Sequence, residues 1–462
     1  MTALSALLRP DKGQAATLLH LVDKAGFEAW LKALPPRVRQ AAEAQGFRGE
    51  GFQLAILPGA GDEWSAALGV ANAAELSAWC LAKAAESLPE GSYRVAGRGP
   101  GPATLGWLLA QYRFDRYRNE KKGACPRILL TDEPARIDES VAIADATFLV
   151  RDLVNIPAGD LGPAELQAAV EAVAKAGGAK LAVTEGKALD EGYPMVAAVG
   201  RAAAKGREPR LIELEWGDQR HPKLAVIGKG VCFDSGGLDI KSSAGMRLMK
   251  KDMGGAAHAL ALAQLIMQAK LPVRLHLLIP AVENAVSGGA FRPGDVLRSR
   301  KGLSVEIGNT DAEGRLILGD ALTRAAEAEP ELILDFATLT GAARIALGPD
   351  LPALFANDDA LAEALLASGT NVSDPLWRMP LWAPYEEMLA SDIADLGNMA
   401  DAPFAGAVTA AIFLQKFVPE GTPWAHFDTF AWRPSAKPGR PKGGDALGLR
   451  AAWHMLRSRY GR

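Results

Sequence analysis

Three short segments of the chain carry charged side chains at spacings that suit catalysis. In the segment "NTDAEGRL", Asp311, Glu313 and Arg315 occupy alternate positions. If this segment is extended, residues two apart point to the same side, so two carboxylates and a guanidinium share one face. Carboxylates that close repel each other, so we expect either Arg315 or a bound cation to offset the repulsion.

The other two segments add two more carboxylates. The segment "GKGVCFDSGGLDIK" contains Lys229, Asp234 and Lys241, and its glycines allow sharp turns and a close approach of the backbone. The segment "MKKDMGG" places Asp252 just before an apolar helical stretch, where it is a natural N-cap. Taken alone, each segment is better explained by a structural role, as a turn, a helix cap or an ion pair.

The surrounding elements predict that the four carboxylates converge. The apolar strands "KLAVIGKG", "VRLHLLIPAVEN", "LSVEIGN" and "ELILDFATL" alternate with helical patterns over 255–269 and 316–328. This alternation predicts a mostly parallel sheet covered by helices on both faces, and in such sheets ligands gather beyond the carboxyl ends of the strands. Four carboxylates at one such edge, in a chain with only 6 histidines, predict a two-metal site built from oxygen ligands.

The length of 462 residues predicts two domains, since a single core rarely grows to that size. Strand and helix patterns alternate in the first part as well, and a helical pattern over 137–155 ends at the helix-breaking "IPAGDLGP". We therefore expect an α/β protein with a smaller N-terminal α/β domain over 1–136 and a linker helix over 137–160. The larger catalytic domain is expected over 161–462, with a mostly parallel central sheet flanked by helices.

Composition excludes several classes of protein. No apolar run approaches the length of a membrane span, and "MTALSALLRPDKG" is too short in apolar residues for a signal peptide, so we expect a cytoplasmic protein without membrane contact. The net charge of -3 gives no electrostatic indication of nucleic-acid binding. Cys80, Cys125 and Cys232 are too widely spaced for a metal-binding CxxC pair and are expected to be buried thiols.

The three charged segments closely resemble the signature segments of the leucyl aminopeptidase family, the two-metal cytosolic aminopeptidases of the M17 class. All three occur in the family's order and with family-like separations between the acidic positions. A weaker resemblance continues through "RDLVNIPAGDLGPAEL", "DFATLTGA", "SDIADLGNM" and "WAHFDTFAW", so it covers roughly residue 150 to the C-terminus. Before that point only "YRFDRYR" is similar to the family's variable N-terminal domain.

The resemblance implies a set of metal ligands. It implies that Lys229, Asp234, Asp252 and Glu313 bind one metal ion, and that Asp234, Asp311 and Glu313 bind the other. Zinc is the family's usual ion, and manganese, magnesium or cobalt can occupy the looser site. A lysine ligand must be a neutral amine, which an adjacent dication favours because it competes with the proton for the nitrogen lone pair.

The resemblance also implies a reaction and a substrate. A water activated by two metals would attack the first peptide carbonyl of a peptide with a free N-terminus, and Lys241 would donate a hydrogen bond to the developing oxyanion. Arg315 would hold a bicarbonate that acts as general base, and the family assembles as a homohexamer. The positions that would line the substrate site are Met249, Asn309, Thr338 and Leu339.

Two alternatives to a simple aminopeptidase remain open. One is another two-metal hydrolase of amides, such as a dipeptidase, and the other is an aminopeptidase that also binds DNA as a regulator. We do not expect nucleic acid as a partner, because the net charge is near zero and the sequence has no basic run beyond "YRFDRYRNEKKGACPR". His258 and His426 are expected to be hydrogen-bonded structural residues. Thr429 and Phe430 depart from the smaller or aliphatic residues usual in the family, which leaves the preferred N-terminal residue open.

Overall fold

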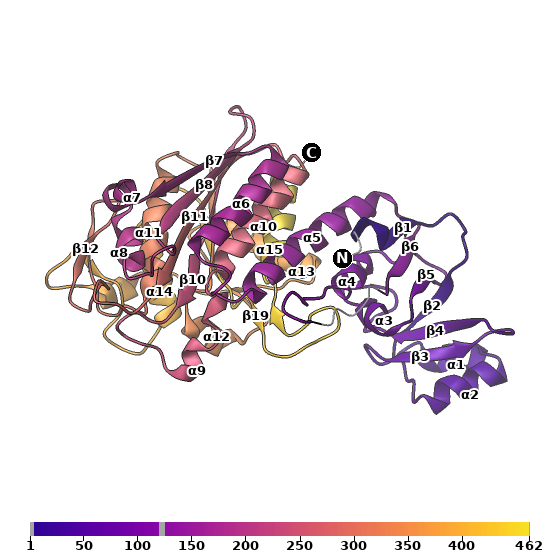
Figure 1. Ribbon diagram of the computed structural model, residues 1–462. Helices are drawn as coiled ribbons and strands as arrows, with labels where there is room; N and C mark the ends of the chain where they lie inside the picture. Colours follow the sequence, from indigo (N-terminus) through magenta and orange to yellow (C-terminus); the bar gives the residue numbers. More distant parts are fainter. Residues whose placement is uncertain (1–3, 120–124, 462) are drawn as a thin grey trace. The chain divides into compact units, whose positions relative to one another are not determined.

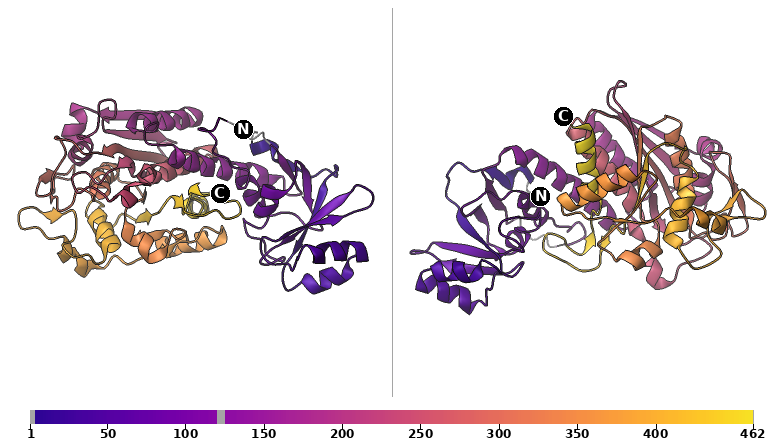
Figure 2. Two further views of the ribbon diagram at one scale, coloured as in Figure 1. Left: turned by 60° about the horizontal axis from the view of Figure 1, so that its bottom comes forward. Right: turned by 180° about the vertical axis from the view of Figure 1, so that it is seen from behind.

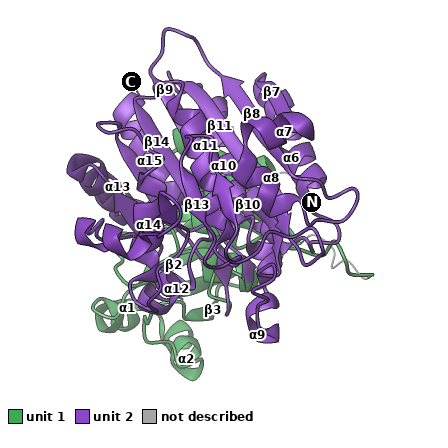
Figure 3. Cartoon of the chain, turned by 90° about the vertical axis from the view of Figure 1, so that its left-hand side faces the viewer, with its two compact units in different colours: residues 1–148, 435–442 green, residues 149–434, 443–462 purple. Residues whose placement is uncertain are grey.

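The computed structural model describes residues 4–119 and 125–461 and divides into two compact units, shown in Figure 3. Unit 1 is Met1–Phe148 with Ser435–Lys442, and unit 2 is Leu149–Pro434 with Gly443–Arg462. The division falls inside the long helix α5 (Ala135–Asn155), whereas the sequence placed that helix in a separate linker. Residues 120–124 of the basic run lie outside the described residues.

Unit 1 contains a six-stranded sheet in the order β1-β6-β5-β2-β4-β3. All neighbouring strands are parallel except β3 and β4. The strands are β1 (Leu8–Pro10), β2 (Thr17–Val22), β3 (Leu54–Pro58), β4 (Trp64–Gly69), β5 (Gly91–Val95) and β6 (Arg127–Thr131). The helices wholly inside this unit are η1 (Leu4–Ala6), α1 (Phe27–Ala33), α2 (Pro36–Ala44), α3 (Ala82–Ser87) and α4 (Ala103–Leu109).

The sequence of unit 1 also has apolar helical patterns over 73–88 and 103–117, and the helices that form there are shorter than these patterns predict. The pattern over 73–88 forms a helix only from Ala82, because the hydroxyl of Ser77 accepts the N–H of Trp79 and fixes a turn before it. The pattern over 103–117 ends as a helix at Leu109. The α/β class of this unit is nevertheless as predicted.

Unit 2 is built on a nine-stranded sheet in the order β16-β15-β18-β14-β9-β11-β8-β7, with β10 paired to the end of β11. The central strands β18, β14, β9 and β11 are parallel, while β7, β8 and β15 pair antiparallel toward the edges. The strands of this sheet are β7 (Lys180–Glu185), β8 (Arg210–Trp216), β9 (Lys223–Gly228), β10 (Gly230–Asp234), β11 (Arg274–Asn284), β14 (Leu332–Ala337), β15 (Ala353–Ala356), β16 (Trp377–Arg378) and β18 (Trp424–Asp428). The mostly parallel central sheet is confirmed.

Helices cover both faces of this sheet, as Figures 1 and 2 show. One layer holds α6, α10 and α15, and the other holds α8, α11 and α14. The helices of unit 2 are α6 (Pro163–Gly177), α7 (Lys187–Gly192), α8 (Pro194–Gly200), α9 (Ser243–Met246), η2 (Met249–Lys251), α10 (Gly254–Gln268), α11 (Glu313–Ala326), α12 (Gly341–Leu347), α13 (Asp359–Asn371), η3 (Ala383–Leu389), α14 (Gly406–Gln415) and α15 (Leu449–Tyr460). Within the described residues, no helix combines the length and the apolar character that crossing a bilayer needs.

One predicted strand lies outside the main sheet. The segment "LSVEIGN" contributes β13 (Ser304–Glu306) to a separate three-stranded sheet with β12 (Val296–Arg298) and β17 (Leu396–Gly397). A further two-stranded sheet pairs β19 (Trp432–Arg433) with β20 (Gly443–Gly444). The prediction that all four carboxylates follow strands of a single sheet is therefore wrong for Asp311 and Glu313. It is also wrong for Asp252, which follows the short helix η2.

The register of the central strands brings their carboxyl ends level. Phe336 of β14 pairs with Gly228 of β9, and Ala337 pairs with Asp428 of β18. The residues that follow these three strands therefore emerge side by side at one edge of the sheet, the edge where ligands bind in open α/β folds.

Candidate active site

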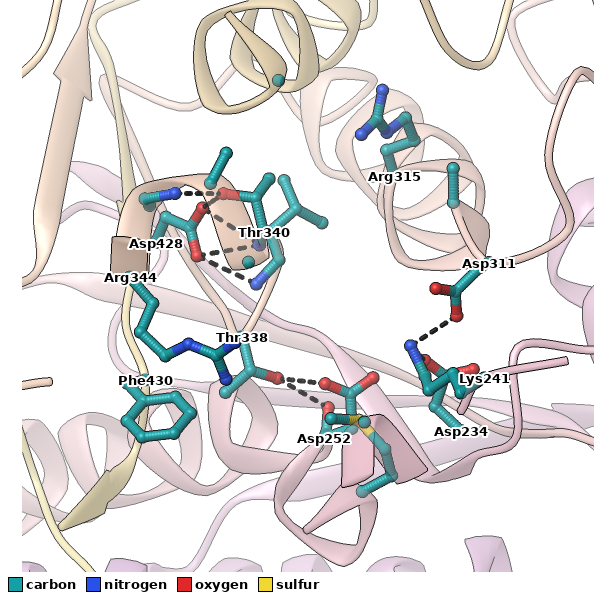
Figure 4. Close-up of a pocket in the computed structure, with 18 of the residues that line it drawn as sticks. Asp234, Lys241, Asp252, Asp311, Arg315, Thr338, Thr340, Arg344, Asp428 and Phe430 are labelled. Carbon is teal, nitrogen blue, oxygen red and sulfur yellow. Dashed lines mark hydrogen bonds and ion pairs between the residues drawn. The ribbon is translucent and has the colours of Figure 1, made fainter. Parts of the chain in front are cut away.

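The predicted site residues gather around one cavity of about 730 Å³ in unit 2, shown in Figure 4. Lys229 directly follows β9, Asp234 ends β10, and Thr338 directly follows β14. The predicted residues that line the cavity are Lys229, Asp234, Lys241, Met249, Asp252, Asn309, Asp311, Glu313, Arg315, Thr338 and Leu339. The whole predicted set is thus brought together.

Asp252 does not have the capping role that its position before α10 predicted. The N-cap of α10 is Met253, without a side-chain hydrogen bond, and Asp252 follows the short helix η2. Its Oδ1 accepts the hydroxyl of Thr338 at 2.9 Å, and its Oδ2 lies 2.8 Å from Nζ of Lys229. The carboxylate is therefore turned into the cavity.

The segment "NTDAEGRL" is also not extended. Asn309 to Ala312 form a turn, and Glu313 is the first residue of α11. Arg315 donates from Nη1 to the carbonyl of Asn398 at 2.7 Å, and Figure 4 shows its side chain apart from that of Asp311. Arg315 is therefore not the cation that offsets the carboxylates of its own segment.

Lys229 lies at the centre of the buried carboxylates. Its Nζ is 2.8 Å from Oδ2 of Asp252 and 2.9 Å from Oε1 of Glu313, and all three side chains are at most 3% exposed. Burial lowers the pKa of Lys229, but Asp252, Glu313 and Asp234 outweigh that effect and raise it above its usual value. The ammonium of Lys229 thus supplies positive charge between these carboxylates.

Lys241 holds the second pair of carboxylates. Its Nζ lies 2.7 Å from Oδ2 of Asp234 and also pairs with Asp311. Despite burial, these carboxylates raise the pKa of Lys241 above its usual value. Burial and the neighbouring Asp234 raise the pKa values of Asp311 and Glu313, as expected for like charges crowded away from water.

The donor set fits a divalent cation. One carboxylate oxygen from each of Asp234, Asp252 and Glu313 lies within 4.8 Å of the others. Within the described chain, Oε2 of Glu313 is buried with no hydrogen-bond partner, and Oε1 of Glu313, Oδ2 of Asp252 and Oδ1 of Asp311 face only lysine ammonium groups. Buried acceptors without donors are rare in folded proteins, and oxygen-rich clusters of this kind suit hard divalent ions.

Several residues that position the site were not singled out from the sequence. Asn284, the last residue of β11, donates from Nδ2 to Oδ1 of Asp234 at 2.9 Å. Thr310 accepts the N–H of Asp239 at 2.9 Å and donates to the carbonyl of Gly236 at 2.7 Å, which ties the two acidic loops together. Of these residues, only Asn284 could have been found from the sequence, because it is a polar residue at the end of a long apolar strand.

Asp428 is a further residue that the sequence did not single out. Its carboxylate accepts the backbone N–H of Leu339 at 3.0 Å and the hydroxyl of Thr340 at 2.6 Å. Figure 4 shows these bonds beneath the loop that follows β14. Asp428 therefore holds the part of that loop that lines the cavity, and it is not itself turned toward the carboxylate cluster.

The histidine and cysteine predictions have mixed outcomes. His258 is buried with both ring nitrogens bonded, to the carbonyl of Gly254 at 2.7 Å and the N–H of Leu447 at 3.0 Å, so its structural role is confirmed. His426 is paired with Asp335 in the sheet. Cys80 and Cys232 are buried, but Cys125 is exposed, so the prediction is wrong for that thiol.

Comparison with known proteins matches both parts of the chain. The model of the cytosol aminopeptidase family, catalytic domain, matches residues 148–452, and that of the M17 aminopeptidase N-terminal domain matches residues 18–130. The crystal structure of a cytosol aminopeptidase from Coxiella burnetii is 45% identical, with a TM-score of 0.92 over 98% of this chain and 99% of that one.

Two further relatives extend the comparison. The bottromycin maturation enzyme BotP, in a complex with Mn, is 34% identical, with a TM-score of 0.87 over 97% of this chain and 100% of that one. A Syntrophotalea carbinolica protein named "Probable cytosol aminopeptidase" is 42% identical over 76% of this chain and 73% of its own.

These matches and the fold define an α/β peptidase of two domains, and the chain belongs to the cytosol aminopeptidase family, M17. It is accordingly a hydrolase that acts as an aminopeptidase.

Proposed function

We propose that this enzyme is a two-metal aminopeptidase that releases the N-terminal residue from peptides. In this proposal Lys229, Asp234, Asp252 and Glu313 hold one ion, and Asp234, Asp311 and Glu313 hold the other. The observation that carries it is the convergence of buried carboxylates, in which one oxygen from each of Asp234, Asp252 and Glu313 lies within 4.8 Å of the others. The ions are zinc, or manganese, magnesium or cobalt in the second site.

When bound, the two ions would acidify a water molecule and polarise the carbonyl of the first peptide bond. Lys241 stands at the edge of the same cluster, where its ammonium can donate a hydrogen bond to the carbonyl oxygen as negative charge develops on it. The free α-amino group of a peptide supplies an additional nitrogen ligand. The requirement for that group would restrict cleavage to N-termini.

Arg315 is proposed to hold a small planar anion, bicarbonate, which would supply a proton acceptor when bound. Its side chain lines the cavity, and its Nε is buried without a hydrogen-bond partner in the described chain. Burial lowers the pKa of Arg315 to about 10, so the guanidinium stays charged at neutral pH. A charged planar fork with a free N–H is well suited to a planar anion.

The test compares aminoacyl amides with their N-acetylated forms, before and after treatment with a chelator. We expect cleavage of the free amides only, loss of activity with the chelator and recovery on adding Zn²⁺ or Mn²⁺. Cleavage of acetylated substrates would favour the alternative of a different two-metal amide hydrolase. Full activity after metal removal would contradict the mechanism.

We also propose that the enzyme works in the cytosol as a homohexamer. The location is supported by the name of its relatives, cytosol aminopeptidases. The assembly rests on the family resemblance, and sedimentation equilibrium of the purified chain measures it directly. A mass six times that of one chain is expected.

A further inference from the structure

One end of the cavity carries two cationic side chains around a single aromatic ring. The Cζ of Arg344 lies 5.0 Å from the ring centre of Phe430, and Nζ of Lys251 lies 5.5 Å from the same centre. All three residues line the cavity. Arg344 belongs to α12, Lys251 ends η2, and Phe430 follows β18, so three separate elements build this end of the cavity.

The guanidinium of Arg344 is not matched by a carboxylate. Within residues 4–119 and 125–461, the guanidinium of Arg344, an exposed residue, makes no ion pair or hydrogen bond and stacks on the face of Phe430. Asp428, which also lines the cavity, is occupied by the loop that follows β14. A cation that stacks on an aromatic ring keeps its N–H groups available at the ring edge for an anion.

Lys251 adds a buried donor beside the proposed metal ligands. It is 5% exposed, and its Nζ lies 3.2 Å from Oδ1 of Asp252, an oxygen that already accepts the hydroxyl of Thr338. An ammonium has three N–H donors, so this one contact leaves donors for a ligand in the cavity. Lys251 thus connects the end with Arg344 to the carboxylate cluster.

We propose that Arg344, Lys251 and Phe430 form the pocket for the side chain of the N-terminal residue, and that this pocket favours glutamate or aspartate. The inference rests on the proposed function and adds that the substrate amine lies at the ion held by Asp252. The side chain next to that amine then lies beside Lys251. Figure 4 shows Arg344 and Phe430 on the same side of the pocket as Thr338 and Asp252, with Arg315 elsewhere.

The chemistry of the pocket fits an acidic side chain in two respects. Phe430 and Met249 offer apolar contact for the methylene groups of glutamate. The guanidinium of Arg344 can bind the terminal carboxylate through two parallel hydrogen bonds, a geometry that the amide of glutamine cannot reproduce. Glutamine has the same shape and no charge, so it is the informative comparison.

The experiment measures kcat/KM of the metal-loaded full chain for N-terminal Glu, Gln and Leu substrates with one common leaving group. We expect Glu to exceed Gln by about tenfold or more, in line with one charge-assisted hydrogen bond. The variant Arg344→Gln should reduce the Glu:Gln ratio about tenfold, and Arg344→Lys, which keeps the charge without the fork, should reduce it less. Arg247→Gln is the matched control, because Arg247 is exposed and does not line the cavity.

Each outcome bears on a defined claim. A Glu:Gln ratio near one in the unmodified enzyme, or a high ratio that Arg344→Gln leaves unchanged, would overturn the acidic pocket. The acidic pocket would also be overturned if the enzyme preferred an acidic second residue, measured with Leu-Glu and Leu-Gln dipeptides, and if Arg344→Gln abolished that preference. If no substrate with a free N-terminus is cleaved, including the Leu substrate, the proposed function itself is contradicted. Circular dichroism and thermal melting of each variant verify that it is folded.

Discussion

At the residue scale, the centre of the site is a balance of charge between four carboxylates and two lysines. Lys229 is shared by Asp252 and Glu313, and Lys241 is shared by Asp234 and Asp311. Removing one member of a buried charge network leaves its partner uncompensated, at a cost of about 3 to 5 kcal/mol. The same residues that bind ions in the proposed mechanism therefore also stabilise the ion-free protein.

Asp311 is the member whose replacement best separates function from folding. Its side chain is 32% exposed, so Asp311→Asn removes one carboxylate ligand at the edge of the site with little loss of core packing. We expect the variant to lose one equivalent of metal and at least about a hundredfold in kcat, with a melting temperature near that of the unmodified ion-free chain. Elemental analysis and thermal melting are the measurements.

Asp190→Asn is the control for Asp311→Asn, because Asp190 is exposed on α7 and lies outside the cavity. It should keep both metal and activity. An Asp311→Asn enzyme that retains full metal content and activity would contradict the assignment of Asp311 as a ligand.

At the element scale, α11 both carries site residues and fixes its neighbour α8. Glu313 and Arg315 lie in its first turn, and Asp320 lies further along. Asp320 accepts the N–H groups of Met195 at 2.8 Å and Val196 at 3.3 Å, at the start of α8. The side chain of Asp320 thus caps α8 and fixes the start of that helix against α11.

The titration of Asp320 gives a prediction for stability against pH. Burial raises its pKa to about 7 in the folded chain, against an ordinary value near 3.8. The folded state therefore binds a proton more tightly than the unfolded state, so the stabilising contribution of this group is present at low pH and is lost as pH rises through 7. Relative to Asp320→Asn, the unmodified chain should lose about 2 kcal/mol of unfolding free energy between pH 5 and pH 8.

Urea unfolding at a series of pH values measures this difference. Asp320→Asn is expected to be less stable at every pH, because its amide N–H₂ would face one of the backbone N–H groups that the carboxylate accepts. If the difference in unfolding free energy between the unmodified chain and Asp320→Asn stays constant from pH 5 to pH 8, the raised pKa of Asp320 is refuted.

At the scale of the whole molecule, α5 does not separate the two units as a free linker. Its last third, residues 149–155, belongs to unit 2, where Arg151 is fully buried and its Nη2 lies 3.0 Å from Oδ1 of Asp445. Asn155 accepts the N–H of Gly444 at 2.8 Å. The catalytic unit therefore includes residues that precede the boundary expected at 161.

Truncation tests where the catalytic unit begins. A fragment over 161–462 lacks the partner of Asp445 in α5 and should be less stable than a fragment over 135–462 by about 3 to 5 kcal/mol, the cost of breaking a buried ion pair. Thermal melting of both fragments, with the full chain as the reference, measures the difference. Equal melting temperatures would show that residues 149–155 of α5 contribute nothing to this unit.

The sequence alone determined the α/β class, the central apolar strands and the charged residues that line the cavity. Each of these follows from local information: near-continuous apolar runs such as "KLAVIGKG" predict buried parallel strands, and polar residues directly after them, such as Lys229, must emerge at the strand ends. The resemblance then supplied the identity of the ligands. The helices expected over 255–269 and 316–328 were also predicted well, because the helical spacing of their apolar residues is local information too.

Only the tertiary structure decided which charge faces which. Nothing local to "NTDAEGRL" shows that Glu313 would begin a helix and meet Lys229, that Arg315 would turn to Asn398, or that β13 would leave the main sheet. The contacts of Asp252 with Thr338, and of Arg344 with Phe430, join residues about 86 positions apart in each case. Such pairings depend on packing between distant elements, which periodicity and residue type within a single segment do not encode.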